Sequence, residues 1–101
     1  MQKFRVTVIN EVGLHARPAA LFVQCACLFQ SEIMVRNVTS ERDFVDAKSI
    51  LGVLVLCVKK DHVIEIKVSG EDELDATETL KVLIESDFQA LPDDLPSTIE
   101  E

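Results

Sequence analysis

Residues 13–20 of the chain read Gly-Leu-His-Ala-Arg-Pro-Ala-Ala, with His15 between a glycine turn and a proline that opens an apolar stretch. Pro18 has a fixed φ and no N–H group, so it suits the first turn of a helix, where backbone donors lack intrahelical partners. The stretch therefore predicts a helix that begins just after His15. Gly13 permits backbone angles that let the preceding loop turn, so that His15 can face solvent.

The start of this predicted helix has the features of a phosphate site. Unpaired N–H groups and the positive end of the helix dipole favour an anion close to the imidazole of His15. Arg17 adds a planar, permanently charged guanidinium that suits phosphate oxygens. A neutral imidazole is also a nucleophile near pH 7. A single histidine in a loop is more often solvated, but its neighbours Gly13, Arg17 and Pro18 favour a phosphoryl acceptor.

Alternating and helical patterns predict the order strand, helix, strand, strand, helix, strand, helix. Strands are expected at residues 4–8, 32–36, around Phe44 and 63–69, and helices over 16–29, over 47–53 and after an acidic first turn at 71–73. Asp46 is the expected N-cap of the helix over 47–53. This order indicates an α+β fold with helices packed on one face of an antiparallel sheet.

The short helix over 47–53 is unusually apolar. Ile50, Leu51 and Leu54 cannot all point inward from so short an element, so part of this surface is expected to be exposed to a partner. The alternative, that all three side chains belong to the core, stays open at this point.

Composition restricts the class of protein. The 101 residues suit one domain, and no apolar run approaches the roughly 20 residues that cross a bilayer. The N-terminus has no secretory pattern, so we expect a cytoplasmic protein without membrane insertion. A net charge of −8 argues against non-specific nucleic-acid binding. Cys25, Cys27 and Cys57 are expected to be buried free thiols rather than a metal site or a disulfide framework.

The last 13 residues differ from the rest in composition. Residues 89–101 contain two prolines, two aspartates and two glutamates, which make a poor helix or strand. We therefore expect one domain over residues 1–88 and an acidic, mobile tail over 89–101.

The stretch Gly-Leu-His-Ala-Arg-Pro-Ala resembles the active-site signature of the HPr family, the histidine-containing phosphocarriers of the bacterial phosphoenolpyruvate-dependent phosphotransferase system. The similarity continues through Lys-Ser-Ile-Leu-Gly-Val-Leu at 48–54 and Ser-Gly-Glu-Asp-Glu at 69–73, and so covers the chain from about Phe4 to Phe88. It implies an open-faced sandwich, with three helices on one face of a four-stranded antiparallel sheet.

The resemblance also implies how the chain works. Enzyme I would phosphorylate His15 on Nδ1 with the help of Arg17, and the group would pass to IIA-type acceptor proteins. The chain would be a substrate of other enzymes, a monomer, and independent of any cofactor or metal ion. The implied docking face consists of Ala16, Ala20, Ile50, Leu51 and Leu54.

Ser49 lies where many members of this family are phosphorylated by an HPr kinase/phosphorylase, so the resemblance implies a regulatory site there. The alternative function is a regulatory interaction module of a nitrogen-type or carbon-catabolite chain, acting through Ser49 and the helix over 47–53. Two positions depart from the family pattern: Cys57 replaces a common glycine, and Asp61 is expected to take a left-handed conformation in a turn without glycine. His62 is expected to be a solvated turn residue.

Overall fold

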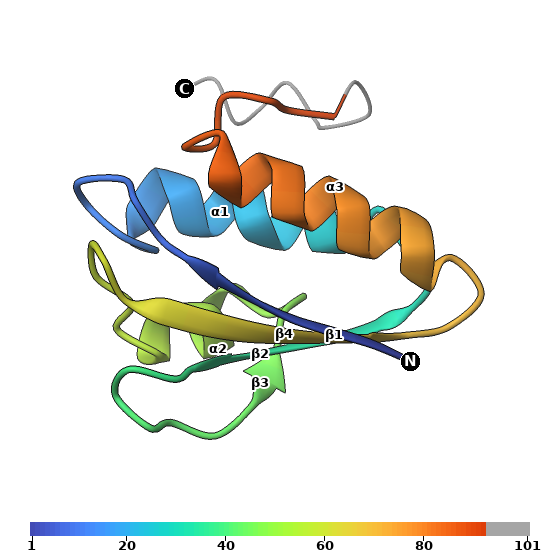
Figure 1. The fold of residues 1–101 in the computed structure, drawn as a ribbon, viewed down its shortest axis with the longest axis horizontal. Coiled ribbons are helices and arrows are strands. Elements are labelled where there is room, and N and C mark those ends of the chain that lie inside the picture. The colour runs from blue at the N-terminus through green and yellow to red at the C-terminus, as the bar shows by residue number, and fades with distance from the viewer. Residues whose placement is uncertain (93–101) are drawn as a thin grey trace.

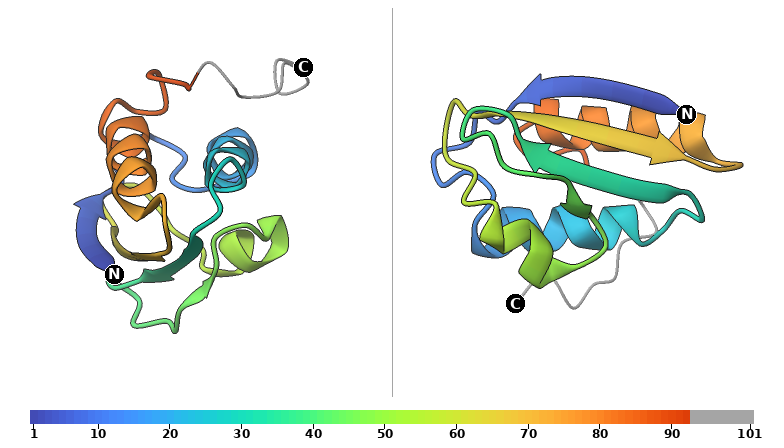
Figure 2. Two further views of the ribbon diagram at one scale, coloured as in Figure 1. Left: turned by 90° about the vertical axis from the view of Figure 1, so that its right-hand side faces the viewer. Right: turned by 90° about the horizontal axis from the view of Figure 1, so that it is seen from below.

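A computed structural model describes residues 1–92 and shows the expected α+β architecture (Figure 1). Its elements are β1 (Gln2–Thr7), α1 (Ala16–Ala26), β2 (Glu32–Asn37), β3 (Val45–Asp46), α2 (Ile50–Val55), β4 (Val63–Ser69) and α3 (Glu73–Glu85). The four strands pair antiparallel in the order β1-β4-β2-β3. Helices α1 and α3 cover one face of the sheet, and α2 lies beside α1 (Figure 2). The predicted open-faced βαββαβα sandwich is confirmed.

The core lies between this sheet face and the helices. In β4 the alternation places Ile64, Ile66 and Val68 on the covered face, where all three are fully buried. Ile66 lies opposite Phe4 of β1 and Val35 of β2, so one residue joins three strands. The helical stripe predicted for α3 is buried as well, at Ala76, Leu80, Leu83 and Ile84.

The predicted end of the first helix is wrong. Helix α1 ends at Ala26, because Leu28 and Phe29 bond to carbonyls three residues back and Lys48 Nζ donates to Phe29 O at 2.7 Å. The third strand, expected around Phe44, is Val45–Asp46. The Phe44 ring instead lies under two cations on the outer face of the sheet.

Asp46 does not cap α2. It pairs with Met34 in the sheet, and its Oδ1 accepts the backbone N–H of Lys48 at 2.9 Å. The helix begins three residues later than predicted, with Ser49 as the N-cap, whose Oγ accepts the N–H of Gly52 at 3.1 Å.

The cysteines are free, but only one of them is buried. Desolvation raises the pKa of the buried Cys25 thiol to about 12. Cys27 and Cys57 are exposed, because one follows the end of α1 and the other follows the end of α2 with a φ of 52°. The prediction of burial is therefore wrong for two of the three.

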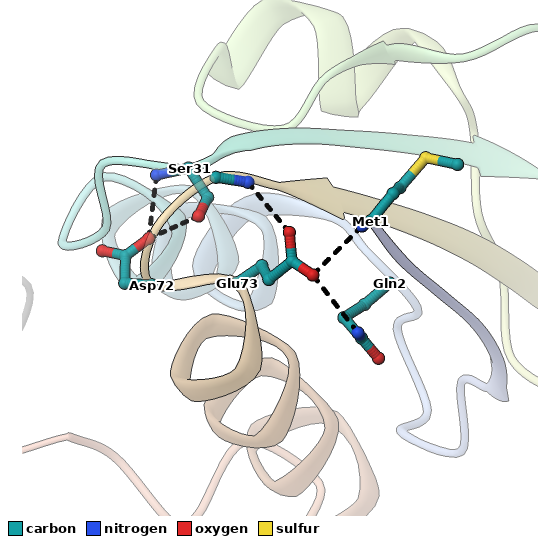
Figure 3. Close-up of polar contacts among 6 residues, drawn as sticks. Met1, Gln2, Ser31, Asp72 and Glu73 are labelled. Carbon is teal, nitrogen blue, oxygen red and sulfur yellow. Dashed lines mark hydrogen bonds and ion pairs between the residues drawn. The ribbon is translucent and has the colours of Figure 1, made fainter.

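Asp72 ties the start of α3 to the start of β2 (Figure 3). Its Oδ2 accepts the N–H of Gln30 at 2.8 Å, and its Oδ1 accepts both the N–H of Ser31, at 2.9 Å, and the Ser31 hydroxyl. The next residue, Glu73, accepts the N–H of Gly70 at 3.1 Å and lies 3.1 Å from the amino group of Met1. These carboxylates are therefore structural ties at a helix start.

Residues 89–92 begin the segment predicted to be a mobile tail, and the rest of it lies outside the described residues. The backbone N–H groups of Gln89 and Ala90 donate to Ser86 Oγ at 3.2 and 2.9 Å. None of the helices in the described chain, residues 1–92, has the length and apolar character needed to cross a membrane.

Candidate functional site

His15 is the N-cap residue of α1. Its backbone is extended, with φ −123° and ψ 154°, and its side chain makes no capping hydrogen bond. The imidazole is exposed. His15 therefore stands at the positive end of the α1 dipole, and its side chain does not cap the helix.

The loop before His15 is held by short-range and long-range contacts. Asn10 forms two hydrogen bonds with Gly13. Its Nδ2 donates to Gly13 O at 2.6 Å, and its backbone carbonyl accepts the N–H of Gly13 at 3.1 Å. Gly13 has a φ of 65°, and a Cβ there would lie 2.2 Å from Val58 O. Leu14 is buried, and its N–H donates to Val58 O at 3.0 Å. The buried Leu14 anchors the loop, so the next residue, His15, points outward.

His15 lines a surface hollow of about 410 Å³, which it shares with the predicted docking residue Leu54. The other residues that line this hollow are Val12, Leu14, Cys57, Val58 and Lys59. The structure thus brings the loop before α1, the end of α2 and the loop after it together around the imidazole. Lys59 carries a positive charge at the rim, which the sequence motif did not indicate because it lies 44 residues further along the chain.

Arg17 lies in the first turn of α1 and is exposed. It lines a second hollow, of about 500 Å³, together with Asn10, Pro18 and Phe88. Val12 borders both hollows, so the two meet at the loop before α1.

The predicted docking residues lie on the neighbouring helices α1 and α2. Leu51 is 73 % exposed and Ile50 is 39 % exposed, whereas Leu54 is partly buried against the core. Ala16 is exposed and Ala20 is half-buried on α1. The prediction that part of this apolar surface is exposed is confirmed, and the alternative that Ile50, Leu51 and Leu54 all belong to the core is wrong. Val55, 57 % exposed, extends the surface and was missed.

Two turn residues behave differently from each other. Asp61 takes the predicted left-handed conformation, with a φ of 73°. His62 is not a solvated residue: it is half-buried, and its Nδ1 lies 3.1 Å from Nδ2 of Asn37 and 3.2 Å from the backbone N of Lys59. The contact with Asn37 could not be predicted from the sequence, because Asn37 lies 25 residues away in β2.

A family model described as "PTS HPr component phosphorylation site" matches residues 2–86. The chain belongs to the HPr family. The phosphocarrier protein HPr of Neisseria meningitidis serogroup A is 40 % identical over 88 residues, which cover 87 % of this chain and 96 % of that protein. Relatives of this kind are named phosphocarrier proteins, and this chain is accordingly a phosphocarrier of the phosphotransferase system rather than an enzyme.

Solved structures of the HPr family show the same fold. HPr-C-His of Thermoanaerobacter tengcongensis superimposes with a TM-score of 0.82 at 43 % identity, covering 87 % of this chain and 96 % of that one. Crh of Bacillus subtilis, a catabolite repression protein, matches at 37 % identity with a TM-score of 0.66, covering 86 % and 97 %.

Proposed function

We propose that His15 accepts a phosphoryl group from phosphorylated enzyme I and passes it to a IIA-type acceptor protein. The observation that carries this proposal is the exposed imidazole at the N-terminus of α1, which the helix does not use as a cap. The positive end of the dipole and the charge of Arg17 stabilise a phosphoryl group there.

Each transfer exchanges one bond for another. The lone pair of neutral His15 Nδ1 attacks phosphorus, the N–P bond forms, and the bond from phosphorus to the donor protein breaks with its electron pair leaving on the donor. The second transfer reverses these roles, with His15 as the leaving group. Such a reaction depends on positioning and on stabilisation of charge, and each docked partner supplies part of both.

The apolar surface of Ala16, Ala20, Ile50, Leu51 and Leu54 is the docking face in this proposal. It adjoins His15, since Leu54 lines the same hollow. A partner that covers this surface excludes water from the transferring group. Enzyme I draws on phosphoenolpyruvate, so the proposed site of action is the cytoplasm, and the proposed carrier is a monomer with residues 89–101 as a tail.

The decisive experiment incubates the chain with phosphoenolpyruvate and enzyme I and measures its intact mass. The expected result is a gain of one phosphoryl group that is acid-labile and absent from His15→Ala. A gain of the same size in His15→Ala would overturn the assignment of His15. Arg17→Ala should still fold but take up the group more slowly.

Ser49 supports a second candidate, a regulatory interaction module. Its Oγ accepts the N–H of Gly52, so a phosphate on this oxygen would lie at the first turn of α2, beside exposed Ile50 and Leu51. About two added negative charges would disfavour apolar or acidic partners at that surface. Treatment with an HPr kinase/phosphorylase, with Ser49→Ala as control, tests this candidate.

A further inference from the structure

Asn37 is a fully buried polar residue whose hydrogen bonds fix the orientation of its amide. Its Oδ1 accepts the N–H of Ser40 at 3.3 Å, and its Nδ2 donates to Leu56 O at 3.1 Å. The second proton of Nδ2 then points to Nδ1 of His62, 3.1 Å away. Because an amide nitrogen can only donate, His62 Nδ1 must be the acceptor.

The backbone N–H of Lys59 approaches the same nitrogen of His62, at 3.2 Å. Nδ1 therefore faces two donors and shares one lone pair between them, which requires a neutral ring that carries its proton on Nε2. A proton on Nδ1 would be opposed by both donors and would break both contacts. The Asn37–His62 pair thus joins β2 to both ends of the segment 56–62.

Segment 56–62 is the support on which the loop before His15 rests. Val58 O accepts the N–H of Leu14 at 3.0 Å, and the backbone at Gly13 packs against Val58 and Lys59. At the other end of the loop, Val8 donates to His62 O at 2.9 Å and accepts the N–H of Asp61 at 2.7 Å. Figure 1 shows the two loops side by side at one end of the sheet.

We propose that His62 is a positioning residue for phosphoryl transfer at His15, and that it acts through the lone pair of Nδ1, which fixes segment 56–62. The proposal rests on the proposed role of His15. The Lys59–His62 turn keeps its backbone bond, from His62 N–H to Lys59 O at 3.0 Å, but loss of the lone pair removes the contact that holds the Lys59 N–H, so the adjacent Val58 carbonyl is held less firmly for Leu14. His15 directly follows Leu14 in the chain. Leu56, whose carbonyl accepts a hydrogen bond from Asn37, is the C-cap of α2. The parts of the docking face on α1 and on α2 are therefore both affected.

The groups around His62 allow the effect of its Nδ1 lone pair to be isolated. Asn37 of β2, which contacts His62 from another element, is uncharged. The charged neighbours belong to the same turn, namely Lys59, Lys60 and Asp61, and Lys60 Nζ lies 3.2 Å from Glu11 Oε2 in the loop before α1.

The test compares three chains: the parent, His62→Asn and His62→Ala. An Asn Oδ1 occupies the place of histidine Nδ1 and accepts hydrogen bonds without binding a proton, whereas Ala removes the acceptor. Two quantities are measured at pH 8. One is the hydrogen-exchange protection of the Leu14 amide, and the other is the rate of phosphorylation by enzyme I.

At pH 8 the parent and His62→Asn should agree, and His62→Ala should lose about threefold to tenfold in both quantities. Asn restores the hydrogen-bond acceptor and Ala does not, so recovery in His62→Asn alone identifies the acceptor, rather than the packing of the ring, as the cause.

Loss in His62→Asn as large as that in His62→Ala would overturn the proposal, as would parent-like behaviour of His62→Ala at pH 8. Thermal unfolding of each chain shows that the fold is intact before the comparison. Leu14 exchange needs no phosphoryl transfer, so a failure of the His15 assignment, seen as phosphate uptake by His15→Ala, is distinguished from a failure of the His62 assignment.

Discussion

Glu65 is the most deeply buried charged side chain among residues 1–92, and it lies on the open face of the sheet. Arg36 Nε is 2.8 Å from Oε1 and Arg5 Nε is 3.5 Å from Oε2. The hydrogen bond from Arg36, assisted by the charge of Arg5, lowers the pKa of Glu65. Because its folded pKa is the lower one, Glu65 contributes its stabilisation above the ordinary glutamate range of about 4 to 5 and loses it as the pH falls through the folded pKa.

Glu65→Gln should therefore destabilise the fold above the ordinary glutamate range, and the effect should disappear as the pH falls through the folded pKa. We expect a loss of about 1 kcal/mol in the free energy of unfolding at pH 7, because the charge-assisted bonds to two arginines are replaced by weaker ones. Urea unfolding at pH 7, 5 and 3.5 should show the difference from the parent closing as the carboxylate is protonated. The exposed Glu32, changed in the same way, is the control. A difference that is equal at all three pH values would contradict the assignment.

Substitution by alanine should change the stability of the fold in opposite directions at Gly13 and at Gly52. A Cβ at Gly13 would lie 2.2 Å from Val58 O at a φ of 65°, and backbone cannot yield as a side chain does, so Gly13→Ala should cost about 2 to 4 kcal/mol. A Cβ at Gly52 would meet Ser49 Oγ at 3.4 Å with no unusual φ, so Gly52→Ala should stabilise α2 by about 0.5 to 1 kcal/mol. Thermal unfolding of both variants measures the contrast, and similar melting temperatures would refute it.

Among the elements, α2 depends on one cap. Ser49→Ala removes the acceptor for the Gly52 N–H and should cost about 1 kcal/mol. Ser49→Asp should retain the parental stability, because aspartate is an equally good N-cap and its charge suits the first turn. Chemical unfolding of the three chains checks this order. An unstable Ser49→Asp chain would show that α2 tolerates no charge at its start.

The elements also show what the sequence can and cannot predict. The alternation in β4 and the helical spacing in α3 placed Ile66 and Leu80 correctly, because each pattern is decided by burial on one face. The cap of α2 was not predictable, since Asp46 and Ser49 are both good caps and only the pairing of Asp46 with Met34 decides between them. The early end of α1 likewise depends on Lys48, which lies in another part of the chain.

In the molecule as a whole, the candidate site likewise contains residues that the sequence predicts and residues that only the packing of the fold brings in. Residues 13–20 place His15 and Arg17 because the motif is local, and a proline fixes where the helix begins. The hollow around His15 also contains Leu54, Cys57 and Lys59, which reach it only through the packing of α2 and the following loop. The role of His62 depends on Asn37, a partner 25 residues away in another strand.

Because the docking face is exposed, docking and stability can be altered separately. Leu51 is 73 % exposed on α2, so Leu51→Ala should change the free energy of unfolding by less than about 0.5 kcal/mol. The same change should raise the KM of enzyme I for the carrier by about threefold to tenfold with little change in kcat, because it removes apolar contact but leaves His15 in place. The measurement is the initial rate of phosphorylation against carrier concentration.

Leu74 offers the matched control for this last prediction. It is 68 % exposed, is also a leucine on a helix, and lies in the first turn of α3, outside the hollows lined by His15 and Arg17. Leu74→Ala should therefore leave KM unchanged. If both variants raise KM equally, general loss of exposed apolar surface is the cause and α2 is not the docking helix. If only Leu51→Ala does so, the face formed by α1 and α2 is the surface that enzyme I recognises.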